Sequence, residues 1–244
     1  MPTFNWLKNA FADGYSSGDI ASPVPNWRRW QEERRIGGSY RQVLAKCILP
    51  YVPQNAVVLE IGPGRGSWTR ALLKSIPTCV MHVVDFQDVA QWLQPEKYDG
   101  RLKCHVISDN AGYSVFPDEY FDFCFSFGVL CHNNIDSIEE ILRNVLPKMK
   151  LGGRAVHQYA DWEKLEAYGW KKGNVPTTFR DKPDDEIWWP RNTRQVMGAV
   201  AARAGWIVIS PDLELVKRDS IILLEKMRKI PSQGLALTSS ASFR

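Results

Sequence analysis

The sequence lacks the features that mark zinc-binding, secreted and membrane-spanning proteins. Its five cysteines form no C-x-x-C pair, which disfavours a zinc site, and their odd number favours free thiols in a reducing compartment. The first residues contain no apolar run of about 7–15 residues, so we expect no signal peptide. No apolar run approaches about 18 residues, so we expect no membrane span. These absences predict a cytoplasmic protein without a metal site.

The sequence also lacks a dense run of basic residues. Lysine and arginine total 31 against 27 acidic residues, a formal net charge of +4. Nucleic-acid-binding proteins usually carry a concentrated basic stripe, so we expect no nucleic-acid partner. Hydrophobic residues make up 44% of the 244 positions, enough for a sizeable core. The length suits one domain with added segments.

Short apolar runs alternate with helical patterns through most of the chain. The run at 56–61 is continuous and apolar, as in a strand buried on both faces. A helix over 136–150 is expected to begin at an Asp136 cap and to end at Gly152 and Gly153. Further strands are expected over 79–85, 102–109, 120–127, 154–160, 206–210 and 220–227, with other helices near 26–49, 67–75, 87–93 and 193–204.

This alternation predicts an α/β fold built on a doubly wound, Rossmann-like, seven-stranded sheet. The sheet is expected to be mostly parallel with an antiparallel last strand. The expected segments are an arm with cap helices over 1–50, a main domain over 51–230 with an insertion over about 161–192, and a flexible tail over 231–244.

The segment VVLEIGPGRGSWTRAL at 57–72 carries the strongest functional signal. A buried strand runs directly into Gly62, Gly64 and Gly66 and then into a helix. Glycine is needed where the backbone takes unusual angles or touches a ligand. The carboxyl end of a parallel strand is also where open α/β sheets bind nucleotides. A dinucleotide fingerprint would need its third glycine at Ser67, which disfavours a nicotinamide-dependent oxidoreductase.

Acidic residues stand at the ends of three successive expected strands. Glu60 precedes the glycine turn, where a carboxylate would repel a pyrophosphate and suit a cationic, phosphate-free ligand. Asp85 ends the second strand, where it can accept both ribose hydroxyls, and Asp109 closes the third, where an adenine amino group would lie. A single acidic residue at a strand end is more often a cap or a solvated residue, but three acidic residues at successive strand ends beside a glycine turn favour a nucleoside site.

With these motifs the chain resembles class I S-adenosylmethionine-dependent methyltransferases. The resemblance rests on the E-x-G-x-G-x-G turn, the two aspartates and FPDEYFDFCFSFGVLCH at 116–132, and it covers about residues 40–160 well. It implies S-adenosylmethionine as cofactor, S-adenosylhomocysteine as product and no metal. The donor-binding residues that it implies are Glu60, Gly62, Gly64, Gly66, Asp85, Phe86, Asp109, Asn110, Ser126 and Gly128.

Methyl transfer from a sulfonium is an in-line displacement, so the protein mainly holds the acceptor near the methyl carbon and excludes water. A hydroxyl or amine acceptor can also need a base. His132, after the fourth strand, is the first candidate, and Tyr159 and Asp161 stand at the end of the fifth. A histidine at a helix start without a catalytic task is an equal alternative for His132.

Ten tryptophans are many for this length, and several gather at 27–30, 162–170 and 188–189. The elements that carry them flank the acceptor side of the fold, so we expect a lid, with ordinary core packing as the alternative. Aromatic rings with nearby arginines suit a sugar, a flat aromatic, or an acceptor with a phosphate or carboxylate. The expected acceptor-binding residues are Tyr40, Trp30, Trp162, Trp188 and Arg191.

The sequence therefore favours methylation of a small molecule, most directly O-methylation of a sugar, glycan or natural-product hydroxyl. N-methylation of a small amine stays open, as does methylation of RNA or protein. Against the latter, SFGV stands after the fourth strand instead of an N-P-P-Y-type tetrapeptide. A non-catalytic binding module with the same fold is the alternative from another class. A homodimer is compatible with the sequence.

Overall fold

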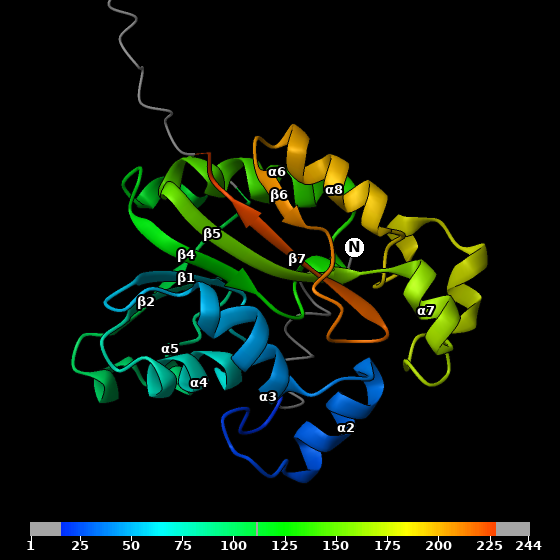
Figure 1. Cartoon of the computed structure of the whole chain (residues 1–244), viewed down its shortest axis with the longest axis horizontal. Coiled ribbons are helices and arrows are strands. Elements are labelled where there is room, and N and C mark those ends of the chain that lie inside the picture. The colour runs from blue at the N-terminus through cyan, green and yellow to red at the C-terminus, as the bar shows by residue number, and fades with distance from the viewer. Residues whose placement is uncertain (1–15, 111, 228–244) are drawn as a thin grey trace, which may run out of the picture.

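The structure is a computed structural model, and it describes residues 16–110 and 112–227 (Figure 1). A seven-stranded sheet forms its centre, with the strand order β3-β2-β1-β4-β5-β7-β6. The first five strands pair in parallel, and β7 runs antiparallel to both β5 and β6. This architecture confirms the predicted doubly wound sheet. The tail predicted over 231–244 lies outside the described residues.

Most strands begin and end close to their predicted bounds. The exception is the fifth, which begins several residues earlier than predicted and contains Gly152 and Gly153. These glycines do not end a helix, because the preceding helix already stops before Pro147, whose nitrogen cannot donate a hydrogen bond. The strands are β1 (Val57–Ile61), β2 (Val80–Asp85), β3 (Leu102–Val106), β4 (Phe121–Ser126), β5 (Met149–Ala160), β6 (Ile207–Ser210) and β7 (Asp219–Glu225).

Local capping interactions set where the helices begin and end. The helix Trp27–Ile36 stops at Gly37, whose φ of 69° lies in the left-handed region and whose amide donates to the Glu33 carbonyl. The predicted Asp136 cap is wrong: Asn134 caps that helix by accepting from the Ser137 amide, and Asp136 lies in the first turn. The helices are α2 (Trp27–Ile36), α3 (Tyr40–Val43), α4 (Ser67–Ser75), α5 (Ala90–Leu93), α6 (Ile135–Val145), α7 (Trp162–Tyr168) and α8 (Arg194–Arg203).

Helices cover both faces of the sheet, α3 to α5 on one side and α6 and α8 on the other (Figure 1). Successive side chains along each parallel strand point to opposite faces of the sheet. Val83 of β2 packs in a cluster with Leu72 of α4, whereas Leu59 of β1 packs with Leu142 of α6. Burial of a large apolar side chain contributes about 1.5–3 kcal/mol to the free energy of folding. The two clusters together therefore hold the sheet rigid.

The insertion after β5 forms a small cluster of its own beside the sheet, around α7 (Figure 1). Leu165, Trp170, Phe179 and Trp189 are buried within it. Aromatic packing therefore accounts for part of the tryptophan content of this segment. In the described part of the chain, no helix is long and apolar enough to cross a membrane.

Candidate functional site

The strand order brings the residues predicted to bind the donor to one edge of the sheet. Gly128, Gly62, Asp85 and Asp109 follow the ends of β4, β1, β2 and β3, which are neighbours in that order. Because parallel strands place their carboxyl ends together, these four positions form one continuous row.

The glycine turn presents bare backbone at the centre of this row. Gly62, Gly64 and Gly66 all have φ in the left-handed region, at 64°, 56° and 81°. A Cβ atom at Gly62 would collide with Cγ2 of Val129, so a side chain fits neither the conformation nor the space. Gly66 begins α4, and its amide donates to the Pro63 carbonyl at 2.9 Å. The turn is built for close approach of a ligand to the main chain.

Glu60 lies beneath the turn, with only 2% of its surface exposed. The Thr69 hydroxyl of α4 donates to its Oε2 at 2.6 Å. Burial raises the pKa of this carboxyl to about 8, an effect that Asp85 reinforces and that Thr69 and Arg70 oppose. The group is thus mostly protonated at neutral pH, and a cation brought beside it would favour the carboxylate.

Asp85 is half-buried, and the Gln87 amide donates to its Oδ1 at 3.1 Å. Burial raises the pKa of Asp85 to about 6. Phe86 beside it is exposed and offers a ring surface. Further along the row, Asp109 is exposed, and the Asn110 amide donates to Glu140 at 2.9 Å. These side chains remain predicted donor contacts.

Ser126 has another role than the predicted one. Its side chain is buried, and its hydroxyl lies 2.9 Å from Nδ1 of His157 on β5. This contact joins β4 to β5 beneath the site. Gly128, two residues later, lines the cavity directly.

A cavity of about 500 Å³ opens on the glycine turn. One wall is aromatic: the Tyr40 ring lies 5.4 Å from Trp68 and 5.2 Å from Phe127, centroid to centroid. Trp188 and Trp189 of the insertion form the other aromatic part of the lining. Tyr40 and Trp188, two of the predicted acceptor residues, thus line this cavity, together with Trp68 and Phe127, which were not predicted.

Helix α2 turns a polar face toward the cavity. Arg28, Gln31, Glu32 and Arg35 all line it, and their spacing of three and four residues places them on one side of the helix. This spacing is visible in the sequence. The predicted acceptor contact on α2 was nevertheless assigned to a tryptophan of this helix and not to its polar residues. Arg35 donates to Glu32 at 2.6 Å.

The tryptophans of α2 point elsewhere. Trp30 is 40% exposed and stacks on Trp27 at 4.8 Å, and it is absent from the described lining of the cavity. The prediction that Trp30 contacts the acceptor does not fit this placement. Buried Arg29 explains the helix orientation, because its guanidinium donates to the carbonyls of Asp19, Ile20 and Ser22.

A buried polar network connects the cavity to β5 and β7. The Gly128 amide donates to Oε1 of Gln158 at 2.8 Å, and Nε2 of Gln158 donates to Asp219 at 2.7 Å. Arg218 binds the same carboxylate with two nitrogens, at 2.7 and 2.8 Å. Its guanidinium also lies 4.5 Å from the centroid of the Trp189 ring. No local motif in the sequence marked Gln158 or Arg218.

His132 lines the cavity, as predicted for a residue that meets the acceptor. Its Nδ1 lies 2.7 Å from the Trp188 carbonyl oxygen, and its ring meets Trp189 edge-on. Because a carbonyl only accepts, Nδ1 carries the proton, and the lone pair of the neutral ring is on Nε2. Burial lowers the pKa of His132 to about 4, so the ring is neutral at physiological pH.

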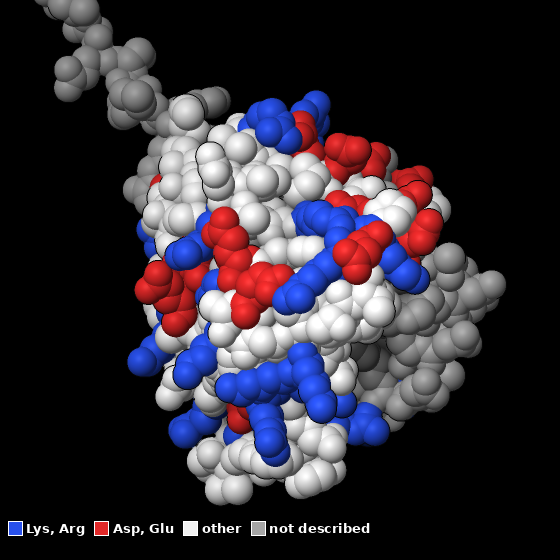
Figure 2. Space-filling view, turned by 90° about the vertical axis from the view of Figure 1, so that its right-hand side faces the viewer, with Lys and Arg blue, Asp and Glu red and all other residues white. Residues whose placement is uncertain are grey.

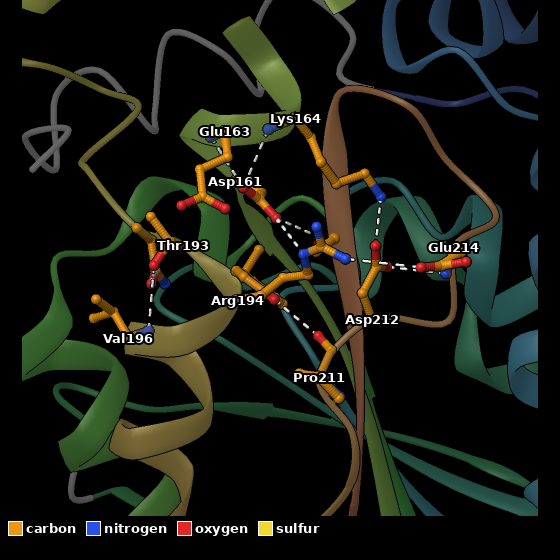
Figure 3. Close-up of polar contacts among 12 residues, drawn as sticks. Asp161, Glu163, Lys164, Thr193, Arg194, Val196, Pro211, Asp212 and Glu214 are labelled. Atoms are coloured by element: carbon orange, nitrogen blue, oxygen red, sulfur yellow. Dashed lines mark hydrogen bonds and ion pairs between the residues drawn. The ribbon is translucent and has the colours of Figure 1, made fainter. Parts of the chain in front are cut away.

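The side chains of Tyr159 and Asp161 both make hydrogen bonds within the fold. The Tyr159 hydroxyl donates to the Pro211 carbonyl at 2.8 Å. Asp161 is fully buried, caps α7 through the amides of Glu163 and Lys164, and accepts from the Ser220 hydroxyl at 2.6 Å (Figure 3). Neither is among the described residues that line the cavity. Their predicted contact with the acceptor does not fit this geometry, because Asp161 joins α7 to β7 and Tyr159 joins β5 to the segment after β6.

Two residues of the insertion that were predicted to contact the acceptor are also engaged in contacts within the fold. Trp162 donates through its indole nitrogen to the Trp189 carbonyl at 3.1 Å. Arg191 binds Asp184 at 2.7 Å and packs over the Trp162 ring. Both side chains bind other parts of the insertion, and the described lining of the cavity includes neither.

The comparison with protein families identifies the central part of the chain. Residues 58–153 match the model described as "Methyltransferase domain". No curated protein matches the sequence. The matched segment begins in β1 and contains the glycine turn, Asp85, Asp109 and His132.

Solved structures share the fold at low sequence identity. A SAM-dependent methyltransferase from Methanosarcina mazei has a TM-score of 0.55 at 15% identity, covering 75% of this chain and 98% of its own. The 1,6-didemethyltoxoflavin-N1-methyltransferase of Burkholderia thailandensis, with bound S-adenosylhomocysteine, has a TM-score of 0.56 at 13% identity, covering 91% and 85%. The [4+2]-cyclase SpnF has a TM-score of 0.62 at 14% identity, covering 91% and 92%. At these identities the likenesses establish the fold.

Proposed function

Because residues 58–153 form a methyltransferase domain of the class I S-adenosylmethionine-dependent type, we propose that this enzyme methylates a small molecule. A hydroxyl of a sugar, glycan or natural product is the acceptor group that we favour. The observation that carries the proposal is the cavity of about 500 Å³ that opens on the glycine turn and is walled by aromatic rings. Cavities of this size take small ligands.

The residues at the sheet edge fit the donor. S-adenosylmethionine supplies a methyl group that is already activated on a sulfonium. The bare backbone of the glycine turn allows close approach, and half-buried Asp85 offers a carboxylate to the ribose hydroxyls. We assign Asp109 and Asn110 to the adenine amino group. We assign Glu60 to the donor's ammonium group, beside which its carboxyl would ionise.

The aromatic wall serves the acceptor. Tyr40, Trp188 and their neighbours offer ring faces on which a sugar or a flat ring packs, and they exclude water from the reacting atoms. Water exclusion matters because it keeps the acceptor, and no other nucleophile, beside the methyl carbon.

His132 is suited to accept the acceptor's proton. The Trp188 carbonyl holds the ring in the Nδ1–H form, so Nε2 carries the lone pair. With the donor bound, Nε2 would take the hydroxyl proton of the acceptor while its oxygen bonds to the methyl carbon and the carbon–sulfur bond breaks, leaving S-adenosylhomocysteine. Such a base contributes about 10²–10⁴ in rate.

The test combines donor binding with an acceptor screen. We expect S-adenosylhomocysteine to bind the folded protein in isothermal titration, and labelled methyl groups to pass from S-adenosylmethionine to members of a panel of sugars, phenols and small amines. Transfer of label to an amine would show that the enzyme N-methylates an amine and does not O-methylate a hydroxyl. Transfer to RNA or protein alone, with none to small molecules, would refute the proposal.

A further inference from the structure

We propose that the protein docks on an anionic lipid surface through the solvent-facing side of α2. The docking surface consists of Val24, Trp27, Trp30 and Arg34, and we call it the tryptophan tip. It lies outside the cavity, and the inference does not depend on the proposed reaction. Three observations carry it: the place of the tryptophans on the helix, their exposure, and the charge around them.

Helix α2 presents three different sides. One side packs on the fold through buried Arg29 and Ile36. A second side carries the polar residues that line the cavity. The third side carries Trp27, Trp30 and Arg34, which are three and four residues apart and all exposed. Since the solvent side of a helix normally carries polar residues, helix packing does not account for two tryptophans there.

The two tryptophans of the tip belong to no core. Trp27 is 68% exposed and Trp30 is 40% exposed, and their rings stack on each other at 4.8 Å. Neither ring appears in the core clusters that the described residues form. Val24, just before the helix, is 73% exposed. Apolar side chains that gather on a surface mark a site of contact with a partner.

The tip lies in a basic part of the molecule. The Arg34 guanidinium lies 5.5 Å from the centroid of the Trp30 ring. Residues 16–50 contain six basic and three acidic side chains, so this segment is net positive whatever ion pairs form within it. Figure 2 shows Lys and Arg side chains gathered above an uncharged lower end, the end at which α2 lies in Figure 1. Charge and apolar surface thus occur side by side.

An anionic lipid surface fits this combination better than other partners do. Tryptophan rings settle at the boundary between headgroups and acyl chains, and basic side chains are attracted to anionic headgroups. A stable protein interface buries about 800 Å² on each partner, more than three apolar side chains offer. A second copy of the chain would bring the basic residues of both tips together. Single-stranded RNA stacks on free ring faces, whereas Trp27 and Trp30 stack on each other.

The test is co-sedimentation of the full chain with lipid vesicles at low ionic strength. One set of vesicles is pure phosphatidylcholine, and the other contains about 30% phosphatidylserine. We expect the protein to bind the anionic vesicles about tenfold or more tightly, and this affinity should fall as salt is added, because salt screens the attraction. Tryptophan emission should shift to shorter wavelength on binding, since Trp27 and Trp30 leave water.

Variants of the tip separate its apolar part from its charge. Trp27→Ser with Trp30→Ser should weaken binding to the anionic vesicles about tenfold or more and remove the emission shift. Arg34→Glu should weaken it about tenfold. The matched controls are Ile209→Ser on β6, an equally exposed kind of apolar residue at 50%, and Arg143→Glu on α6, at the opposite end of the molecule in Figure 1. Both controls should bind as the wild type does.

Several results would overturn the inference. They are an absence of binding to the anionic vesicles, equal binding to both kinds of vesicle, wild-type binding by the double tryptophan variant, and a loss in Arg143→Glu as large as that in Arg34→Glu. If the tip variants instead abolish RNA binding or self-association of a wild-type protein that ignores vesicles, the tip has another partner and the inference is again wrong. Binding of S-adenosylhomocysteine is measured separately, so failure of the proposed function is distinguishable from these outcomes.

Discussion

The Nδ1 atom of His132 lies 2.7 Å from the main-chain carbonyl oxygen of Trp188, which joins the end of β4 to the insertion that follows β5. This single contact sets the tautomer of the histidine and places a lid tryptophan beside it. The candidate base and the candidate lid are therefore one structural unit, and a change in either should affect the other.

His132→Gln is expected to lower turnover by about 10²–10⁴ while S-adenosylhomocysteine binding stays within about twofold. Burial lowers the pKa of His132 to about 4, so the neutral ring persists well below pH 6.5. The acid limb of kcat, measured with saturating donor, should therefore fall near pH 4. Unchanged turnover in the variant would remove His132 from the base role.

Asp85→Ala is expected to weaken donor binding by about 1–3 kcal/mol, the cost of lost hydrogen bonds to a charged acceptor. Burial raises the pKa of Asp85 to about 6, and the ribose hydroxyls prefer the carboxylate form. Affinity for S-adenosylhomocysteine should therefore fall as the pH drops through 6. Asp85→Asn, with no titratable group, should lose this pH dependence; an equal dependence in that variant would assign it to another residue.

Donor binding is expected to release a proton from Glu60. Burial raises the pKa of this carboxyl to about 8, so it is mostly protonated in the free protein at pH 7. The ammonium group of S-adenosylhomocysteine beside it would favour the carboxylate, so affinity should rise with pH toward 8. Calorimetry in two buffers of different ionisation enthalpy measures the release. Glu60→Gln should abolish it, and the same release in that variant would contradict the assignment.

Gly62→Ala is expected to destabilise the protein by about 2–4 kcal/mol, because the new Cβ meets Cγ2 of Val129 and φ is positive. Gly100→Ala is the matched control: its φ is also positive, at 77°, but nothing lies within 4 Å of the added atom. The free energy of unfolding of that control variant should fall by only about 1–2 kcal/mol. Adding Val129→Ala should restore part of the loss at Gly62. Urea unfolding measures all three, and equal losses at both glycines would exclude the collision.

Arg29→Met is expected to destabilise the protein by about 2–5 kcal/mol, since it leaves buried carbonyls unpaired. Arg29 donates to Asp19 at 2.6 Å and to Ser22 at 2.7 Å, and only 1% of its surface is exposed. Arg34→Met, on the exposed side of the same helix, should change stability by less than about 0.5 kcal/mol. If both variants unfold at the same urea concentration, Arg29 does not hold α2 in place.

The sheet and the donor side of the site followed from local patterns. Alternating apolar runs and helices predict parallel strands, and parallel strands bring the ends of β1, β2 and β3 to one edge. Gly62, Asp85 and Asp109 could be singled out because each lies at or just after the end of a strand. Their relative placement depends only on strand order, which the crossover rule constrains strongly.

The acceptor side was decided by contacts between distant segments. Asp161 follows a strand as Asp85 does, yet it caps α7 and binds Ser220 of β7, a partner 59 residues away. Trp30 and Arg35 stand five positions apart on one helix, and the contacts that orient α2, among them those of Arg29, decide that Arg35 faces the cavity. Helix orientation and side-chain pairing depend on packing across the whole molecule. The sequence by itself therefore determined the sheet and the row of residues at its edge, whereas the tertiary structure alone decided which side chains line the cavity.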